Sequence, residues 1–455
     1  MQIQRIRICA ALLIVFTGPL LSAQQRMQER EEEFMQQKPL IGEMLPEVTV
    51  HNPDGTPFST ADLRGHYTVL TFGCLTCPPS MWNIAGLEAV QRDYGPTGVR
   101  FFFIYKTLAH PELAGGYVQP FTNEERQMQA RHAALQFGTK IPWIVDDIDN
   151  RLKHAMGDRP NSQFLIGPDG TIIRKRAWSN PQQVRKDLEE LVGPSKQITK
   201  VEDLNLKIQE PMAGAAARGV VPRLKRPQMM AIKTTPDVAG NKLAFFAKLR
   251  AEADPELLKE GTGMLYLGFH LDPFLNAHWN NLLDPLTVTI ESPDGVQLEQ
   301  PKLTAVKPEA VSDADPREFL IKVESWSADQ PVRLVVTYAA CVGEETCHIV
   351  RQEYTIERIR DPNGGGARGE GAGYWKAEEF ARQMMKGDRD RDRRLKKEEL
   401  VGLVSPHFDA LDVNHDGFLE LEELLPIADW LNHHHKPGTP NPAADARAKQ
   451  GNGDR

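Results

Sequence analysis

The chain has 455 residues and a formal net charge of −8, and 25% of its residues are charged. One hydrophobic core does not extend over so many residues, so we expect roughly two to four domains. Acidic and basic residues are mixed along most of the length and offer no broad cationic face for nucleic acid or an anionic membrane surface. Neither is therefore an expected partner.

The first 23 residues follow the pattern of a secretory signal peptide. Arg5 and Arg7 precede an apolar run over residues 8–16, and small residues follow at 21–23. Because this run is shorter than the ~20 residues that span a bilayer, we expect cleavage after Ala23, with an uncleaved anchor as the alternative. The pattern predicts an exported protein, periplasmic or extracellular, without stable membrane insertion.

Four of the five cysteines would remain after the signal peptide, which contains Cys9, is removed. They form two close pairs, Cys74 with Cys77 and Cys341 with Cys347. In an oxidising compartment such pairs indicate disulfides or redox dithiols. The pairs fall in regions of different sequence pattern, which disfavours a shared zinc site.

Composition divides the rest of the chain into segments. Residues 39–198 alternate short apolar runs with helical stretches, which predicts an α/β domain. Residues 201–360 contain short alternating segments typical of a β-sandwich. The other segments are expected to be a flexible lead-in (24–38), a Gly-rich linker (361–373), an all-α EF-hand pair (374–432) and a disordered tail (433–455).

Local signals mark some elements of the α/β domain. Asn180 as N-cap, Pro181 in the first turn and Gly193 just past the end predict one helix. A second helix is expected over residues 123–138, and residues 168–170 predict a tight turn between two strands.

The dithiol of Cys74 and Cys77 stands between a strand-like apolar run and a predicted helix. Pro78 and Pro79 suit the first turn of a helix, which places Cys77 at its N-cap. A thiol there faces the positive end of the helix dipole, so its pKa falls and its nucleophilic fraction rises. We expect Cys77 to attack and Cys74 to resolve the adduct. A structural disulfide or two buried thiols is the alternative.

The run from residue 62 through the dithiol, together with residues 101–105 and 109–111, resembles the iodothyronine deiodinase branch of the thioredoxin superfamily. In that family a selenocysteine or cysteine follows Phe-Gly-x-x-Thr and precedes Pro-Pro, as Cys77 does here. The likeness covers residues 39–192 and implies a thioredoxin-like fold. It also implies that Pro160 is the cis-proline that presents backbone to a substrate disulfide.

The sequence departs from that family at informative places. Cysteine stands in place of selenocysteine, and Thr107 and Leu108 replace the acidic pair that normally precedes the Ala-His. We therefore expect reduction of protein disulfides or a peroxide, with an external reductant resetting the pair. Reductive dehalogenation stays open on family likeness alone. His110 is either a proton donor or substrate contact, or a surface residue.

The second cysteine pair, Cys341 and Cys347, lies between predicted strands. With residues 268–271 and the turn at 293–295, this region resembles the immunoglobulin-like periplasmic domain of transmembrane disulfide-interchange reductases. That domain also has a Tyr ahead of a cysteine pair at this separation, which implies a redox role. A structural staple across a hairpin-like loop is the alternative. An active pair could exchange electrons with the first dithiol in the same polypeptide.

Residues 412–423 match the EF-hand calcium loop at every diagnostic position. Calcium is a hard cation and requires oxygen ligands, while Gly417 supplies the sharp turn. The expected ligands are Asp412, Asn414, Asp416, the carbonyl of Phe418 and the bidentate Glu423.

An earlier loop has the same spacing, with Asp388, Asp390, Asp392, Arg394 and Glu399 at the matching positions. Arg393 stands where glycine is usual, and a left-handed conformation costs a non-glycine residue ~1–2 kcal/mol. This loop is therefore either a weak calcium site or a metal-free partner of the intact loop. For the whole chain, a calcium-binding scaffold with structural cysteines is the alternative to an enzyme.

Overall fold

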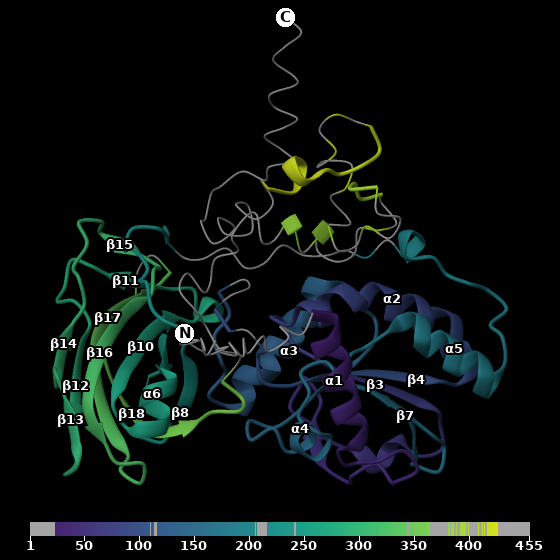
Figure 1. Ribbon diagram of the computed structural model, residues 1–455, viewed down its shortest axis with the longest axis horizontal. Coiled ribbons are helices and arrows are strands. Elements are labelled where there is room, and N and C mark those ends of the chain that lie inside the picture. Colours follow the sequence, from purple (N-terminus) through teal and green to yellow (C-terminus); the bar gives the residue numbers. More distant parts are fainter. Residues whose placement is uncertain are drawn as a thin grey trace, which may run out of the picture.

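The computed structural model describes residues 23–109, 111–112, 116–204, 206, 216–240, 243–343 and 346–364, and scattered positions between 381 and 425. The described chain forms an α/β domain and a β-strand domain, at right and left in Figure 1. The expected signal peptide up to residue 22, most of the Gly-rich linker and the tail lie outside these residues. No described helix is long and apolar enough to cross a membrane.

The first domain is built on a seven-stranded sheet in the order β2-β1-β5-β4-β3-β6-β7. Strands β3, β4 and β5 are parallel, and β6 and β7 continue the sheet antiparallel. This order and these directions confirm the expected thioredoxin-like α/β fold. The strands are β1 (Thr49–His51), β2 (Pro57–Ser59), β3 (Thr68–Gly73), β4 (Arg100–Tyr105), β5 (Trp143–Val145), β6 (Gln163–Ile166) and β7 (Ile172–Arg176).

The helices of this domain cover both faces of the sheet, so β3 is buried along its whole length. Alternate side chains of β3 enter different hydrophobic clusters: Val69 packs with α2, α3 and α5, whereas Leu70 and Phe72 pack with α1 and α4. The helices are α1 (Ala23–Gln36), α2 (Pro78–Tyr94), α3 (Asn123–Phe137), α4 (Arg151–Ala155) and α5 (Pro181–Val192).

Helix α1 occupies most of the segment for which composition predicts a mobile lead-in or a frayed helix. Its Phe34 ring is fully buried and lies 5.9 Å from the ring of Phe164. The Glu31 carboxylate also accepts a hydrogen bond from the Ala177 N–H. A single buried aromatic side chain anchors this helix to the sheet, and composition does not reveal such an anchor.

Local sequence signals correctly predicted the ends of two helices and one turn in the same domain. Asn180 caps α5 by accepting a hydrogen bond from the Gln183 N–H at 3.0 Å, and Gly193 ends the helix. Helix α3 ends at Gly138, whose φ of 61° is left-handed. The tight turn at residues 168–170 is closed by a hydrogen bond from Gly170 to Gly167.

The second domain contains one 11-stranded sheet, which folds back so that its halves share a core. The Ala247 N–H on β9 donates to the Tyr338 hydroxyl on β17, and the Tyr354 hydroxyl on β18 donates to the Ala247 carbonyl. The strands are β8 (Met230–Pro236), β9 (Ala247–Ala253), β10 (Gly263–Leu271), β11 (Ala277–Asn280), β12 (Thr287–Glu291), β13 (Val296–Leu298), β14 (Lys302–Thr304), β15 (Ser312–Asp313), β16 (Arg317–Trp326), β17 (Val332–Val342) and β18 (Thr346–Arg360), and α6 is Pro255–Glu260.

The boundaries of the β-strand domain differ from those predicted at both ends. The 3-10 turn Val201–Leu204 belongs with the first domain, because the side chain of Arg92 on α2 donates a hydrogen bond to the Leu204 carbonyl. At the other end, the expected linker begins with residues that are bound to the first domain: the Asn363 carbonyl accepts a hydrogen bond from Thr107.

The two domains meet through polar and aromatic contacts. Lys248 on β9 forms an ion pair with Glu125 on α3 at 2.7 Å. The Phe121 ring, in the segment between β4 and α3, lies 5.2 Å from the Phe245 ring in an edge contact. The segment that follows β4 therefore lies between the two domains.

Candidate redox site

The dithiol occupies the junction between the central strand and the helix that follows it. Cys74 comes directly after the last residue of β3, and Cys77 is the N-cap residue of α2. The predicted placement is confirmed. Both cysteines are free thiols, and they share a hydrogen bond.

Both sulfurs are buried, in contrast to the accessible thiolate expected from the sequence. Cys74 is 0% and Cys77 1% exposed. They belong to one hydrophobic cluster with Leu75, Tyr105 and Leu108. Cys77 therefore lies at the start of a helix and its sulfur pairs with that of Cys74, as predicted. Solvent does not reach either sulfur in this conformation.

Polar groups converge on Cys74 rather than on Cys77. The Cys74 Sγ accepts a hydrogen bond from the Ala109 N–H at 3.3 Å and from the Lys106 Nζ at 3.6 Å, and the Thr76 hydroxyl lies 3.6 Å away. Burial opposes ionisation of Cys74. The hydrogen bond from Cys77, the Lys106 charge and the two other donors outweigh it and bring the pKa of Cys74 well below its ordinary value.

The same pairing has the opposite effect on Cys77. Its hydrogen bond to Cys74, followed by burial, raises the pKa of Cys77 well above its ordinary value. Of the two sulfurs, Cys74 is therefore the one whose surroundings favour the anion. The sequence predicts the thiolate on Cys77 because that residue caps α2. A helix N-terminus contributes only about 0.3–1 kcal/mol at an exposed site, whereas the Lys106 ammonium lies 3.6 Å from the Cys74 sulfur.

Lys106 also belongs to the candidate site, although it was not predicted from the sequence. It is 1% exposed, and its Nζ also donates to the Thr107 carbonyl at 2.9 Å. The sequence does contain a signal for it. Strands β3 and β4 are parallel and pair Gly73 with Tyr105, so residues 74 and 106 leave the sheet side by side. The signal is a lysine directly after a buried strand, where that strand is the parallel neighbour of the strand that precedes the dithiol.

The turn that presents the Ala109 N–H is fixed by side-chain amides. The Thr107 N–H donates to Asn150 Oδ1 at 3.1 Å, and the Leu108 N–H donates to Gln119 Oε1 at 3.0 Å. Gln119 Nε2 returns a hydrogen bond to the Leu108 carbonyl. These bonds hold the donor on Cys74 in place.

The expected cis-proline is absent. Among the described residues the cis peptide bond is Lys38–Pro39, so the bond before Pro160 is trans. The next residue, Asn161, is fully buried; its Nδ2 donates to the Phe72 carbonyl at 2.8 Å and its Oδ1 accepts from the Ser179 hydroxyl. Side-chain hydrogen bonds of Asn161 thus fix the start of β6. His110, the other expected site residue, lies outside the described residues.

The second pair forms a disulfide between Cys341 and Cys347, which face each other across β17 and β18. Cys341 is buried and Cys347 is exposed. His278 on β11 is the cross-strand neighbour of Cys341. The two pairs lie in different domains, so they do not form a shared four-thiolate site.

The two predicted calcium loops are paired with each other and share a backbone conformation. Leu395 and Leu419 exchange two hydrogen bonds of 2.9 Å, which places the loops side by side. Gly417 and Arg393 both have left-handed backbone, with φ of 82° and 68°. The Asp412 carboxylate accepts hydrogen bonds from the N–H groups of the loop that follows it.

Of the expected ligands, Asp390 lies outside the described residues. Most residues of the helices that would flank the loops lie outside them as well. Within the described part of the chain, no three His, Cys, Asp or Glu side chains are grouped so that they could hold a metal ion. The remaining expected ligands are described: Asp388, Asp392, Arg394, Glu399, Asp412, Asn414, Asp416, Phe418 and Glu423.

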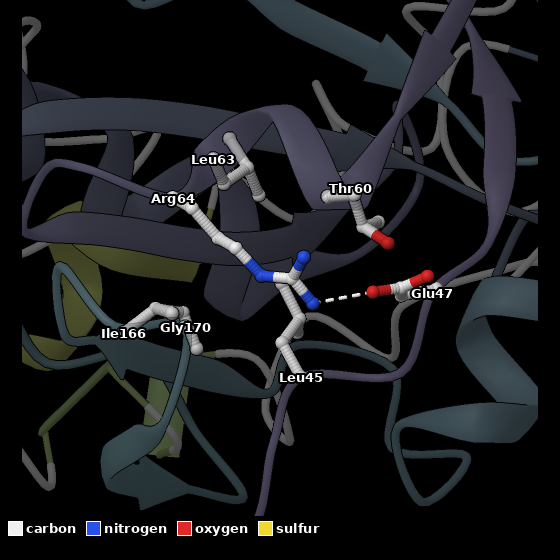
Figure 2. A pocket seen from close by; sticks show the side chains of 8 residues that line it. Leu45, Glu47, Thr60, Leu63, Arg64, Ile166 and Gly170 are labelled. Carbon is white, nitrogen blue, oxygen red and sulfur yellow. Dashed lines mark hydrogen bonds and ion pairs between the residues drawn. The ribbon is translucent and has the colours of Figure 1, made fainter.

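A shallow depression of the first domain lies away from the dithiol (Figure 2). An ion pair between Arg64 and Glu47 crosses it, and Ile166 lines it. Because Ile166 pairs with Thr68 at the start of β3, the depression lies at the other end of that strand from Cys74. It takes no part in the dithiol site.

No family model matches the chain. Solved structures with similar folds include a thiol-disulfide oxidoreductase from Bacteroides fragilis, with 15% identity, 33% of this chain and 99% of that chain covered, and a TM-score of 0.26. A thiol:disulfide interchange protein from a Bacteroides species has 14% identity, with 34% of this chain and 93% of that chain covered and a TM-score of 0.28. The thioredoxin domain of a thiol-disulfide oxidoreductase from Bacteroides vulgatus has 16% identity, with 32% and 96% covered and a TM-score of 0.26.

Proposed function

We propose that the chain is a thiol–disulfide oxidoreductase in which Cys74 attacks the substrate and Cys77 resolves the adduct. The observation that supports this most strongly is the grouping of the Lys106 ammonium and the Ala109 N–H on Cys74, with the Cys77 thiol as hydrogen-bond partner. A structural disulfide has no need of groups that stabilise one of its sulfurs as an anion.

The reaction proceeds in two steps. The Cys74 thiolate attacks a disulfide sulfur or a peroxide oxygen and becomes a mixed disulfide or a sulfenic acid. Cys77 then loses its proton to the leaving group and attacks the Cys74 sulfur, so that a disulfide joins the two cysteines. An external dithiol supplies two electrons and returns the pair to the reduced state.

Trapping with a matched pair of variants tests these roles. In Cys77→Ser the attacking sulfur has no resolving partner, so a mixed disulfide or a sulfenic acid should accumulate at Cys74. In Cys74→Ser little adduct should form, because the pKa of Cys77 is raised. Peptide mapping after alkylation identifies the modified residue. Adducts that form only in Cys74→Ser would restore the opposite assignment, and adducts in neither variant would favour a scaffold with structural cysteines.

We also propose that the C-terminal region binds calcium through an EF-hand pair. The pairing of Leu395 with Leu419 and the left-handed glycine at 417 are compatible with such loops, and calcium would supply positive charge that holds their carboxylates together. Titration with calcium should show affinity on the order of 10⁻⁴ to 10⁻³ M, and Glu423→Gln should weaken it. Equal binding by the variant would exclude this loop.

Export to the periplasm or the cell exterior completes the proposal. The Cys341–Cys347 disulfide fits an oxidising compartment. We regard it as a staple of the β17–β18 hairpin, with exchange of electrons with the first pair as the alternative. Deiodinase-like dehalogenation is a second alternative, and turnover of iodinated phenols would test it.

A further inference from the structure

The β-strand domain contacts the hydrophobic cluster that contains the dithiol. Leu108 and Tyr117 share a hydrophobic cluster with both cysteines, and Phe274 of the β-strand domain packs against this cluster. The ring of Phe274 lies 5.6 Å from that of Tyr117 and 5.1 Å from that of His132 on α3. A side chain from the β-strand domain therefore packs against the hydrophobic cluster that contains both sulfurs.

A second contact comes from residues 361–364, which we call the strap; it leaves the end of β18. The carbonyl of Asn363 accepts hydrogen bonds from the Thr107 hydroxyl and from Gln119 Nε2, both at 3.0 Å. The last carbonyl of the strap accepts a hydrogen bond from Arg250, which is buried on β9. The strap is thus held between the two domains.

Strap and thiolate are connected through two residues. The Thr107 hydroxyl donates a hydrogen bond to the strap, and the Thr107 carbonyl accepts one from the Lys106 Nζ. Gln119, which also holds the strap, fixes the backbone of Leu108 directly before the Ala109 N–H. Moving this turn away from Cys74 would therefore break the strap contacts as well.

The closed arrangement makes different demands on substrates of different size. A protein disulfide must bring its sulfur into contact with Cys74 together with its own flanking backbone, so the turn that contacts Cys74 would have to move and its hydrogen bonds to the strap would break. A small peroxide needs to bring only its O–O bond to Cys74, so a small local movement of the turn is enough to admit it. Access is one of the factors that set rates of thiol chemistry at buried sites.

We propose that Phe274 and the strap form a specificity device that excludes protein-sized disulfides from the dithiol and leaves small peroxides as its oxidising substrates. The inference rests on the proposed redox function and narrows its substrate class. The Cys74 thiolate attacks one peroxide oxygen and the O–O bond breaks. The leaving hydroxide takes a proton, which the Lys106 ammonium beside the sulfur can donate, and departs as water.

The second half of the cycle converts the sulfenic acid on Cys74 into a disulfide. Cys77 attacks the sulfenic acid on Cys74, the S–S bond forms, the S–O bond breaks, and the hydroxyl leaves as water with the Cys77 proton. Two electrons pass from the two thiols to the peroxide in each turnover. An external dithiol small enough to reach the site returns them.

The test compares two oxidants on the reduced full-length chain: hydrogen peroxide and the disulfides of insulin. Formation of the Cys74–Cys77 disulfide is followed by quenching with an alkylating agent and peptide mapping. At equal concentration, peroxide should oxidise the pair at least about tenfold faster than insulin does. An equal or faster reaction with insulin would overturn the inference.

Two alanine substitutions at glycine provide a matched pair of variants. In Gly364→Ala the new Cβ would lie 2.4 Å from the Ala231 Cβ and 3.0 Å from Asp361 Oδ2, so the strap must shift. In Gly95→Ala, at the end of α2, the new Cβ meets only the Gln91 side-chain amide, at 3.1 Å and beyond. The first variant should raise the rate with insulin by about tenfold, as expected when hydrogen bonds of the closed state are lost, and the second should leave it unchanged.

Phe274→Ala opens the same site without touching the strap, and should also raise the rate with insulin relative to peroxide. If neither Gly364→Ala nor Phe274→Ala changes that ratio, the device does not exist. Failure of the redox proposal looks different: neither oxidant would then join Cys74 to Cys77 in any variant.

Discussion

Replacing Lys106 by methionine removes the positive charge beside the attacking sulfur while keeping most of the side-chain volume. Two unit charges separated by the 3.6 Å between Lys106 Nζ and Cys74 Sγ interact by about 4–5 kcal/mol at an effective dielectric constant of about 20. Loss of that interaction lowers the thiolate population by up to about a thousandfold, and the full factor applies at a pH below the wild-type pKa of Cys74. The pKa of Cys74 rises accordingly.

The rate should fall by less than the thiolate population. A more basic thiolate is a better nucleophile, with a Brønsted coefficient of about 0.4–0.5, so the net loss of rate should be at most about 30-fold to 100-fold. The loss should shrink as the pH rises, because the variant thiol then ionises as well. Stopped-flow oxidation by hydrogen peroxide, measured as a pH–rate profile, checks this.

Lys175→Met is the matched control for Lys106→Met. Lys175 is also buried, but its Nζ lies 4.8 Å from the centre of the Phe34 ring, on the face of the sheet that α1 covers. This variant should keep the wild-type pH–rate profile. A Lys106→Met protein with an unchanged profile would refute the reasoning that assigns the thiolate to Cys74.

Three further predictions concern stability. Phe34→Ala should destabilise the first domain by about 3–5 kcal/mol in urea unfolding; an unchanged midpoint would mean that α1 does not pack on the sheet. Asn180→Ala should cost about 1 kcal/mol through loss of the α5 cap, and Asn180→Ser should restore most of it. Burial opposes ionisation of Glu318, but Arg223 and the hydroxyl of Tyr266 outweigh it and lower the pKa of Glu318 to about 2. Its contribution is present above the ordinary Glu pKa of about 4.3 and is lost as the pH falls towards 2, so Arg223→Met should flatten the acid limb of the stability profile of the β-strand domain.

The features that local chemistry determines were predictable from sequence. Asn180 and Gly193 bound α5 because caps and left-handed glycines act within one turn of chain. The position of Cys77 at the start of α2 followed in the same way from the prolines after it. Alternation of strand and helix signals sufficed for the α/β class of the first domain.

The features that depend on distant residues were not predictable in the same way. Which sulfur holds the charge depends on Lys106, 32 residues from Cys74 in sequence. The strap at Asn363 contacts Thr107 across 256 residues. A glycine-rich composition predicts a free linker at the strap, and only the fold reveals the hydrogen-bond donors that meet it.

The reduction potential of the Cys74–Cys77 couple tests the central claim most directly. Groups that stabilise the Cys74 thiolate stabilise the reduced pair, and a stabilised reduced form raises the potential. Equilibration of the full-length chain with glutathione and dithiothreitol buffers, followed by alkylation, should place the couple above about −300 mV, the upper bound typical of structural disulfides. A potential below that value, or a pair that never forms a disulfide, would contradict the account.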